Sequence, residues 1–400
     1  MKTRDIALCA AAAWFGAGLA VAFAQQKGPP AAGAQAPAPR VPAARPRSSM
    51  TSVLPPQDES KMPKALYVLP PVPHDYKPRR TPWGDPDLRG VWPIDNLGGL
   101  ALQRTVAMGN RVLLSDEEFA ARETLMEQWR RAAADEDKEN KLGSGNWVEM
   151  NGAGRRTSLL IDPPNGRLPE LTPEGKRLDA LGRSSWVRGQ TFDWVTDFDT
   201  WDRCVTRGFP ASMLPFRYNN GIQIFQSPGT VVISLEMIHD ARVIPTDGRP
   251  APPSQVKSWM GASRGHWEGH TLVIETSNIR PGASPLNMAT IGAPPNNTIP
   301  MSDRAHVTER LTPTGPDSIV YEMTFSDPVY WTAPFTVRLD WQRNQKYGMF
   351  EYACHEGDEQ IRNYITASRA QRAKDAAAKQ AGGQPPQALA QPQAATPKPS

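Results

Sequence analysis

The second half of the chain alternates between apolar and polar residues with a period of two. In residues 230–238 the apolar side chains fall at every second position, from Val231 to Met237. The same alternation recurs in residues 319–325 and 335–341. A period of two is typical of a β-strand that buries one face, because successive side chains point to opposite faces of a sheet. The pattern therefore predicts a strand at each of these places.

Shorter apolar runs extend this strand pattern, and turn signals separate them. They lie at residues 221–225, 241–244, 271–276 and 306–311. Pairs such as Asp247-Gly248 mark the turns. Together the runs predict about seven or eight strands. Because no helical pattern separates them, we expect a mainly β fold, an antiparallel meander that closes into a barrel or folds into a sandwich, and we favour a barrel or half-barrel.

Two helix starts precede the strands. Ser115 is followed three residues later by Glu118, the spacing of a capping box, so we expect a helix over residues 116–137. A threonine followed by proline opens a second, shorter helix over residues 172–182. The fold is therefore expected to carry two N-terminal helices beside the strands.

The first residues are typical of a secretion signal. Lys2 and Arg4 precede an apolar run at residues 6–23, and small residues surround the expected cleavage site after Ala24. A membrane anchor is the alternative, but the run is short for one and no stop-transfer flank follows. We therefore expect residues 1–24 to be a signal peptide, and the mature protein to be periplasmic or secreted, without a transmembrane anchor.

Composition divides the remaining chain into four parts. Residues 25–74 and 369–400 are rich in Ala, Pro and Gln and carry almost no periodic apolar pattern. Such segments cannot bury enough apolar surface to offset the entropy of ordering, so we expect a disordered linker and a disordered tail. Between them we expect an irregular and helical part at residues 75–200 and the antiparallel β domain at residues 201–368.

The charge of the chain argues against one class of partner. The 400 residues include 45 Lys and Arg against 41 Asp and Glu, a formal net charge of +4. The basic residues are spread among acidic ones and form no stripe with interleaved aromatic residues. We therefore expect no nucleic-acid partner.

Two cysteines remain after the predicted signal peptide, which contains Cys9. Cys204 and Cys354 would lie in an oxidising compartment, where a disulfide persists. A link between them would close a loop of about 150 residues, which restricts the unfolded chain strongly. We expect this disulfide; two thiols that stay free or bind a ligand are the alternative.

Two histidines, each followed by a carboxylate, stand at the ends of β-like runs. They form the pairs His239-Asp240 and His355-Glu356. A histidine oriented by a carboxylate is suited to general acid-base chemistry near neutral pH. These four residues are the catalytic candidates, and a disulfide at Cys354 would bring His355 near Arg203. The alternative is that both are hydrogen-bonded structural histidines.

Four further residues are candidates for substrate binding. Arg203 and Arg242 could bind an anionic group, and Glu236 and Tyr352 lie beside the histidine pairs in sequence. The polar strand faces that include Glu236 could line a lumen or face solvent, and strand alternation does not distinguish the two.

A metal site is not predicted. His266 and His270 bracket a hairpin turn, but their spacing is not that of two zinc ligands on one helix, and no third ligand is evident. We therefore expect no metal and no other cofactor.

The sequence resembles two known groups of proteins. A Gly-x-Trp at residues 90–92 is similar to the start of lipocalin-type barrels, which implies a lipocalin-like barrel. Six blocks together resemble a family of secreted bacterial proteins that has no assigned activity. They are TPWGDPDL at 81–88, LPELTPEG at 168–175, DRC at 202–204, EMIHDAR at 236–242, RGHWEG at 264–269 and EYACHEG at 351–357. The resemblance spans residues 81–368 and implies one exported unit, without catalytic residues to carry over. His270 follows the fifth block where an aspartate is expected, which weakens a metal site there.

Two functions from different classes follow. The first is an exported β-barrel-like protein that binds a small, mostly apolar organic ligand between aromatic and methionine side chains. The second is a cofactor-independent hydrolase or lyase that acts on a small organic substrate through the histidine and carboxylate candidates.

Overall fold

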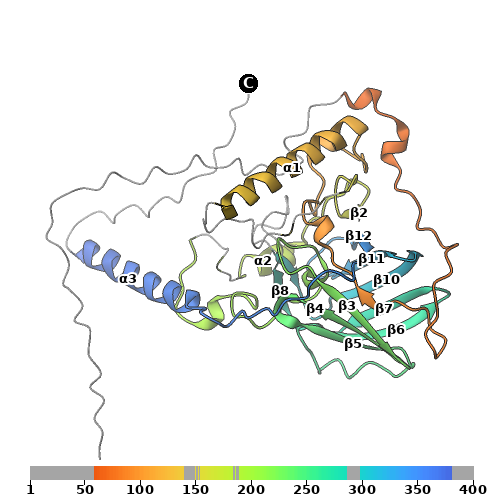
Figure 1. Ribbon diagram of the computed structural model, residues 1–400. Helices are drawn as coiled ribbons and strands as arrows, with labels where there is room; N and C mark the ends of the chain where they lie inside the picture. Colours follow the sequence, from red (N-terminus) through yellow and green to blue (C-terminus); the bar gives the residue numbers. More distant parts are fainter. Residues whose placement is uncertain are drawn as a thin grey trace, which may run out of the picture. The chain divides into compact units, whose positions relative to one another are not determined.

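The computed structural model describes most of the chain between residues 58 and 380 (Figure 1). The described residues are 58–138, 149, 152, 154–182, 185, 189–285 and 298–380. The predicted signal peptide, residues 25–57 of the predicted linker and the tail from residue 381 lie outside them. Antiparallel β-sheet is the main regular structure of this described part.

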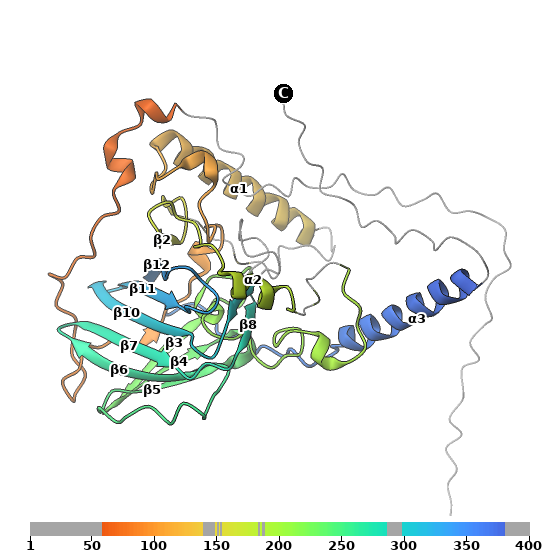
Figure 2. The same cartoon turned by 180° about the vertical axis from the view of Figure 1, so that it is seen from behind.

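The larger sheet has six strands in the order β2-β12-β11-β10-β7-β6, and every neighbouring pair is antiparallel. The strands are β2 (Leu160–Asp162), β6 (Ala262–Glu268), β7 (Thr271–Ser277), β10 (His306–Gly315), β11 (Ser318–Ser326) and β12 (Phe335–Gln342). Apolar residues line up across one face, where Tyr321 pairs with Leu311 on one side and Leu339 on the other. All three side chains are fully buried. Figure 2 shows β10, β7 and β6 side by side in this order.

A second sheet has four strands in the order β1-β3-β4-β5. They are β1 (Gly90–Val91), β3 (Ile222–Ser227), β4 (Thr230–Leu235) and β5 (Ala241–Pro245), and a separate two-stranded ribbon joins β8 (Gly282–Pro285) to β9 (Thr298–Met301). The alternating run predicted at residues 230–238 forms β4. The strand ends at Leu235, because Ile238 and His239 take positive φ angles in a tight turn before β5.

The apolar faces of the two large sheets share one core. Ile233 and Ile244 of the smaller sheet belong to the same buried cluster as Leu311 and Phe325 of the larger one. Burial of these faces against each other is the main stabilising contribution expected of such a packing. The apolar faces of the strands therefore form the interior between the sheets. On the polar faces, Glu275, for example, is partly exposed.

The expected closed barrel is not found among the described residues. The strands divide into separate sheets, and β5 and β6, which follow each other in the chain, belong to different ones. A barrel needs every strand to pair with two neighbours. Here β5 and β6 each end a sheet, so the architecture is two facing antiparallel sheets with open edges. The finer lipocalin-like assignment stays a prediction from sequence.

The expectation of two N-terminal helices beside a barrel is also not borne out. Helix α1 (Asp116–Lys138) begins at Ser115, whose hydroxyl accepts the Glu118 N–H at 3.2 Å, while the Glu118 carboxylate accepts the Ser115 N–H at 2.9 Å. Helix α2 (Pro173–Asp179) has only seven residues, and a third helix, α3 (Gln360–Gln380), lies at the other end of the described chain. The remaining helical turns are of the 3-10 type: η1 (Glu59–Lys61), η2 (Lys64–Tyr67), η3 (Asp95–Leu97), η4 (Val106–Met108), η5 (Val195–Asp197), η6 (Ala211–Met213) and η7 (Met237–His239).

The boundaries expected from composition also shift. In the predicted linker, the Leu66 carbonyl accepts the N–H groups of Val112 and Leu113 at 2.8 and 3.0 Å. The predicted tail contributes residues 369–380 to α3, whose alanines favour a helix. Strands β1 and β2 come from the part expected to be irregular and helical, so that part completes both sheets. None of the helices in the described ranges combines the length and apolar character that a membrane crossing requires.

Candidate functional site

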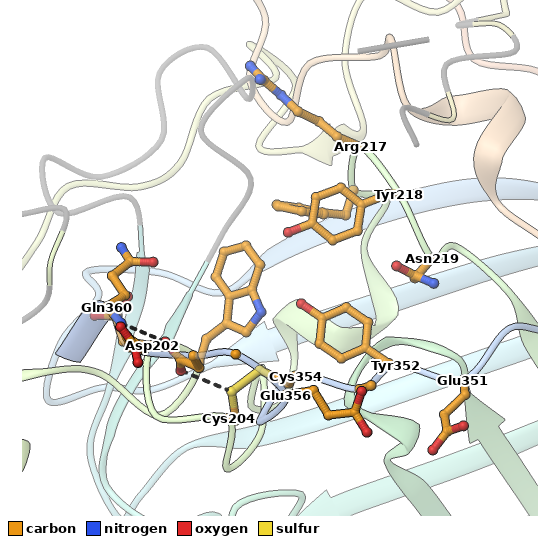
Figure 3. Close-up of a pocket in the computed structure, with 16 residues that line it drawn as sticks. Asp202, Cys204, Arg217, Tyr218, Asn219, Glu351, Tyr352, Cys354, Glu356 and Gln360 are labelled. Atoms are coloured by element: carbon orange, nitrogen blue, oxygen red, sulfur yellow. Dashed lines mark hydrogen bonds between the residues drawn. A yellow bond between two sulfur atoms is a disulfide. The ribbon is translucent and has the colours of Figure 1, made fainter. Parts of the chain in front are cut away.

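A pocket of about 700 Å³ lies beside the sheets, where three segments of the chain meet (Figure 3). The segments are residues 201–204, 216–219 and 351–360. None of them is a β-strand, and only the last includes the start of a helix. The pocket is therefore built by turns and loops.

Two polar side chains shape two of these segments. The Asp199 carboxylate accepts the N–H groups of Trp201 and Asp202, both at 2.8 Å, which closes the turn that leads to Cys204. Asn220 accepts the Phe216 N–H at 2.7 Å and donates to the Phe216 carbonyl at 2.9 Å. Asp and Asn side chains commonly replace backbone partners in turns in this way.

The predicted disulfide between Cys204 and Cys354 is confirmed. The two Cα atoms are 5.6 Å apart across a sequence separation of 150 residues. Both cysteines line the pocket, so the bond joins the turn at 201–204 to the segment at 351–360. The structure thus places the staple at the site itself.

Four aromatic side chains form one side of the pocket, which we call the aromatic wall: Trp201, Phe216, Tyr218 and Tyr352. Their ring contacts are continuous. Trp201 meets Phe216 edge to face at 4.8 Å, and Phe216 meets Tyr218 in the same way at 4.8 Å. Tyr218 and Tyr352 are nearly parallel, with ring centroids 6.4 Å apart. Figure 3 shows the hydroxyl groups of these two tyrosines pointing to the same side.

This aromatic wall belongs to a small cluster that is distinct from the core between the sheets. Trp201 and Phe216 are 8% and 5% exposed, while Tyr218 and Tyr352 are half-buried. Burial and the neighbouring Tyr352 hydroxyl raise the pKa of Tyr218. Tyr218 is therefore neutral at physiological pH, and the two rings offer an aromatic surface to the pocket.

Acidic side chains also line the pocket, and we call them the acidic rim: Asp202, Glu351, Glu356, Asp358 and Glu359. Asp202 accepts the Ser185 N–H at 2.9 Å and its hydroxyl at 2.6 Å. Glu359 forms an ion pair with Arg362 at 2.6 Å. The other three rim residues are exposed. Asp358 approaches Cys204 Sγ at 3.5 Å, but a disulfide sulfur carries no hydrogen, so this is a contact and not a donated bond.

Glu236, a predicted substrate-binding residue, does not line the pocket, and its carboxylate instead supports the segments that form it. Its side chain is 3% exposed. One oxygen accepts the Asn219 amide and the Phe350 N–H, both at 3.0 Å. The other accepts the Gly221 N–H at 2.9 Å and the Tyr347 hydroxyl at 2.7 Å. One carboxylate therefore links the loop at 216–221 to the segment that leads to residue 351.

The Tyr347 hydroxyl lies within hydrogen-bond distance of two carboxyl groups. Its hydroxyl oxygen lies 2.7 Å from Glu236 and 3.0 Å from each carboxyl oxygen of Glu149. One O–H can donate to only one of them, so the second short contact requires a proton on the other carboxyl. Burial and the nearby Glu236 charge raise the pKa of Glu149, against hydrogen bonds from Asn220 and Tyr347 that lower it. The direction of this shift favours the protonated form of Glu149.

The first histidine pair lies outside this pocket. His239 is exposed and stands in the η7 turn, and its ring has no hydrogen-bond partner within the described chain. Asp240 accepts the Thr206 hydroxyl at 2.6 Å. Burial raises the pKa of Asp240, and the Thr206 hydrogen bond and the His239 charge oppose part of that rise. The expected orientation of His239 by Asp240 is not seen as a hydrogen bond.

The second histidine pair lies next to the pocket, but only one of its two residues lines it. Glu356 is part of the acidic rim, whereas His355 is exposed and is not among the lining residues. Arg203 lies in the turn at 201–204 and donates to the Asp199 carbonyl at 3.1 Å. The structure thus brings Tyr352, Glu356 and both cysteines into one site, and leaves the two histidines and Arg203 out of its lining.

Arg242 lies in the core between the sheets, not at the pocket. It is 2% exposed and donates to both oxygens of Glu309 on β10, one at 2.8 Å. The Tyr321 hydroxyl also donates to Glu309 at 2.8 Å, and the Arg242 guanidinium lies over the Phe209 ring at 4.2 Å. This network bridges the two sheets, so Arg242 is a structural residue in this position.

The histidines of the β6-β7 hairpin do not assemble a metal site. His266 contacts Glu268 at 3.2 Å, and no described contact joins it to His270. Within the described ranges, no three His, Cys, Asp or Glu side chains are grouped closely enough to hold a metal ion.

Sequence reasoning missed most of the aromatic wall, and it also missed Glu149 and Tyr347. The sequence did contain a signal for Trp201, because this residue lies three positions before Cys204, much as Tyr352 lies two positions before Cys354. Phe216, Tyr218, Glu149 and Tyr347 carried no such signal, because they come from loops far from either cysteine. Comparison with known proteins gives this site no precedent: no protein-family model, no curated protein and no solved structure matches the chain.

Proposed function

We propose that this chain is an exported protein that binds a small organic ligand in the pocket beside the Cys204–Cys354 disulfide. The observation that carries the proposal is the aromatic wall, because its four rings line the pocket and the half-buried Tyr218 and Tyr352 keep part of their surface exposed there. A volume of about 700 Å³ lies within the range of small-molecule sites, which are concave and mostly apolar with a few polar groups. The disulfide supports export, since such bonds persist in oxidising compartments.

Binding is favoured over hydrolase or lyase chemistry by the state of the catalytic candidates. A general base must be held within hydrogen-bond reach of its substrate. His239 and His355 are exposed, and neither ring is hydrogen-bonded to a carboxylate in the described chain. Neither lines the pocket. No histidine of the described chain is therefore positioned for acid-base catalysis at the proposed ligand pocket.

The test combines native mass spectrometry with three soluble probes of one shape: benzylammonium, benzyl alcohol and benzoate. The full chain is purified under non-reducing conditions from an exporting host, and bound small molecules are identified by mass. Probe binding is followed by ligand-observed NMR. Replacing Tyr352 by Ala removes part of the aromatic wall and should weaken binding about fivefold or more, as expected for the loss of a buried aromatic contact.

Phe350 supplies the matched control. It is an aromatic residue two positions away, 71% exposed, and it does not line the pocket. Its contact with Glu236 is made by the backbone N–H, which Phe350→Ala keeps. The Phe350 variant should bind like the unaltered chain. Absence of any co-purified organic molecule, together with no probe binding that depends on Tyr352, would contradict the proposed function.

A further inference from the structure

The charges around the pocket are strongly one-sided. Its lining carries five carboxylate side chains and a single guanidinium, that of Arg217. Three of the carboxylates already have donors: Asp202 from Ser185, Glu359 from Arg362, and Asp358 from the Gln360 N–H at 3.1 Å. Glu351, Glu356 and Asp358 are exposed on the rim and face the same space as the aromatic wall. The electrostatic potential of this space is therefore negative, because fixed charges of one sign add in a concave site.

A second guanidinium lies behind the aromatic wall, and its positive charge opposes the negative potential of the pocket. Arg207 is 3% exposed, donates to the Leu214 carbonyl at 2.8 Å and lies over the Phe216 ring at 4.9 Å. Its charge thus faces Phe216 from the protein side, and one face of that ring is already occupied. Arg207 and Arg217 also act electrostatically on Tyr218, so both positive charges have to be set against the acidic rim. Even with Arg207 and Arg217 counted together, the carboxylates remain in the majority.

We propose that the ligand of this pocket is an organic cation, an amine or quaternary ammonium group carried on an apolar or aromatic body. This inference rests on the proposed function and adds the sign of the ligand's charge. Aromatic faces attract cations through the ring quadrupole, most strongly for Trp and then Tyr. The acidic rim supplies the counter-charge beside them. An anionic ligand would be repelled by the same rim, and a neutral one would gain only from the apolar contact.

The two contributions act together because they come from different segments held at one place. Trp201 comes from the turn at 201–204, while Tyr352, Glu351 and Glu356 come from the segment at 351–360. The Cys204–Cys354 bond joins these two segments. A ligand with a cationic head and an apolar body would contact the aromatic wall and the acidic rim at once. Such a divided ligand is typical of aromatic and carboxylate sites that recognise ammonium groups.

The experiment compares the same three probes by charge. Benzylammonium, benzyl alcohol and benzoate share one ring and differ in a group that is positive, neutral or negative at pH 7. We expect benzylammonium to bind about tenfold more tightly than benzyl alcohol, within the range that a cation gains over aromatic faces. Benzoate should bind more weakly than either. Raising the ionic strength should reduce the preference for the cation, since the rim charges are exposed.

Charge variants separate the rim from a general effect of net charge. The triple variant Glu351→Gln, Glu356→Gln and Asp358→Asn should reduce the preference for benzylammonium to about threefold or less, leaving the aromatic part of the effect. A control triple variant changes three carboxylates outside the pocket by the same net charge: Glu170→Gln, Glu174→Gln and Asp303→Asn. This control should keep the full preference.

The outcomes distinguish this inference from the proposed function. If benzyl alcohol or benzoate binds as tightly as benzylammonium, in a manner lost in Tyr352→Ala, the pocket binds ligands and the cation proposal is wrong. If the control triple variant lowers the preference as much as the rim variant, the rim does not select the charge and the proposal is also overturned. If no probe binds in a Tyr352-dependent way and no organic molecule co-purifies, the proposed function itself fails.

Discussion

The core between the sheets and the pocket beside them are held together by different kinds of bonds. In the core, antiparallel strands repeat the same backbone pairing, and buried apolar side chains fill the space between them. Around the pocket, turns with positive φ angles at Cys204 and Asn219 are fixed by the Glu236 side chain and by one disulfide. A repeated pattern tolerates the loss of one contact better than a site that depends on a few long-range bonds.

The largest effect that tests this comparison is expected from the disulfide. All strands from β3 to β12 lie between Cys204 and Cys354 in the chain, so the bond restricts the unfolded form of both sheets. Replacing both cysteines by Ala should lower the free energy of unfolding by up to about 5 kcal/mol in the chain-entropy picture. Urea unfolding followed by circular dichroism measures the change, and the reduced natural chain should agree with the variant. An unchanged unfolding midpoint would show that the bond adds nothing beyond the loops it joins.

The next effect concerns the buried Arg242–Glu309 ion pair between the two sheets, and it tests the same comparison in the core. Arg242→Met leaves the Glu309 carboxylate buried without its cation, which should cost about 3 to 5 kcal/mol of unfolding free energy. The double variant Arg242→Met with Glu309→Leu should recover most of that loss, apart from the Tyr321 hydroxyl that then lacks its acceptor.

An exposed pair of the same type serves as the control for that experiment. Arg249 forms an ion pair with Asp247 at the surface, where both side chains are at least one third exposed. Arg249→Met should change the unfolding free energy by less than about 1 kcal/mol, because surface ion pairs contribute little. If Arg242→Met destabilises no more than Arg249→Met, the buried network is not what joins the two sheets.

Much of the sheet structure could be predicted from the sequence, because its signal is local. The alternation in residues 319–325 and 335–341 follows directly from one buried face on β11 and β12. The division into two sheets had no such signal. Strands β1 and β2 have only two and three residues, too few to show a period. Which strand pairs with which is set by long-range packing, so the sequence could not distinguish a closed barrel from a half-barrel or a sandwich.

The site was predictable only where it adjoins the disulfide. Tyr352 and Glu356 could be found because they flank Cys354, whose partner followed from the number of cysteines. Arg242 was misassigned for the opposite reason. Its spacing from Ile244 already places both on one inward face, but the partner that makes Arg242 structural, Glu309, is 67 residues away. Side chains that act in pairs across such distances leave no pattern in the sequence.

The smallest effect is expected from the proton that Tyr347 shares with two carboxyl groups, and it distinguishes the pocket from the core by pH. The pKa of Glu149 is raised above its ordinary value of 4.5, first by burial, so the folded protein holds this proton more tightly than the unfolded chain. The resulting stability is fully present below the unfolded pKa and is lost as the pH rises through the folded one.

The Arg242–Glu309 pair has no such requirement, since its charges compensate each other. Glu149→Gln keeps an amide that can donate to the Tyr347 oxygen and cannot ionise. Its unfolding free energy should therefore fall less than that of the natural chain as the pH rises above the ordinary glutamate pKa of 4.5. Asp240, whose pKa is raised as well, contributes the same slope to both proteins, so the difference between the two curves reports Glu149 alone. Glu170→Gln, an exposed change of the same type, should run parallel to the natural chain. If the Glu149→Gln curve also runs parallel, Glu149 is ionised in the folded protein and Tyr347 is not sharing its proton.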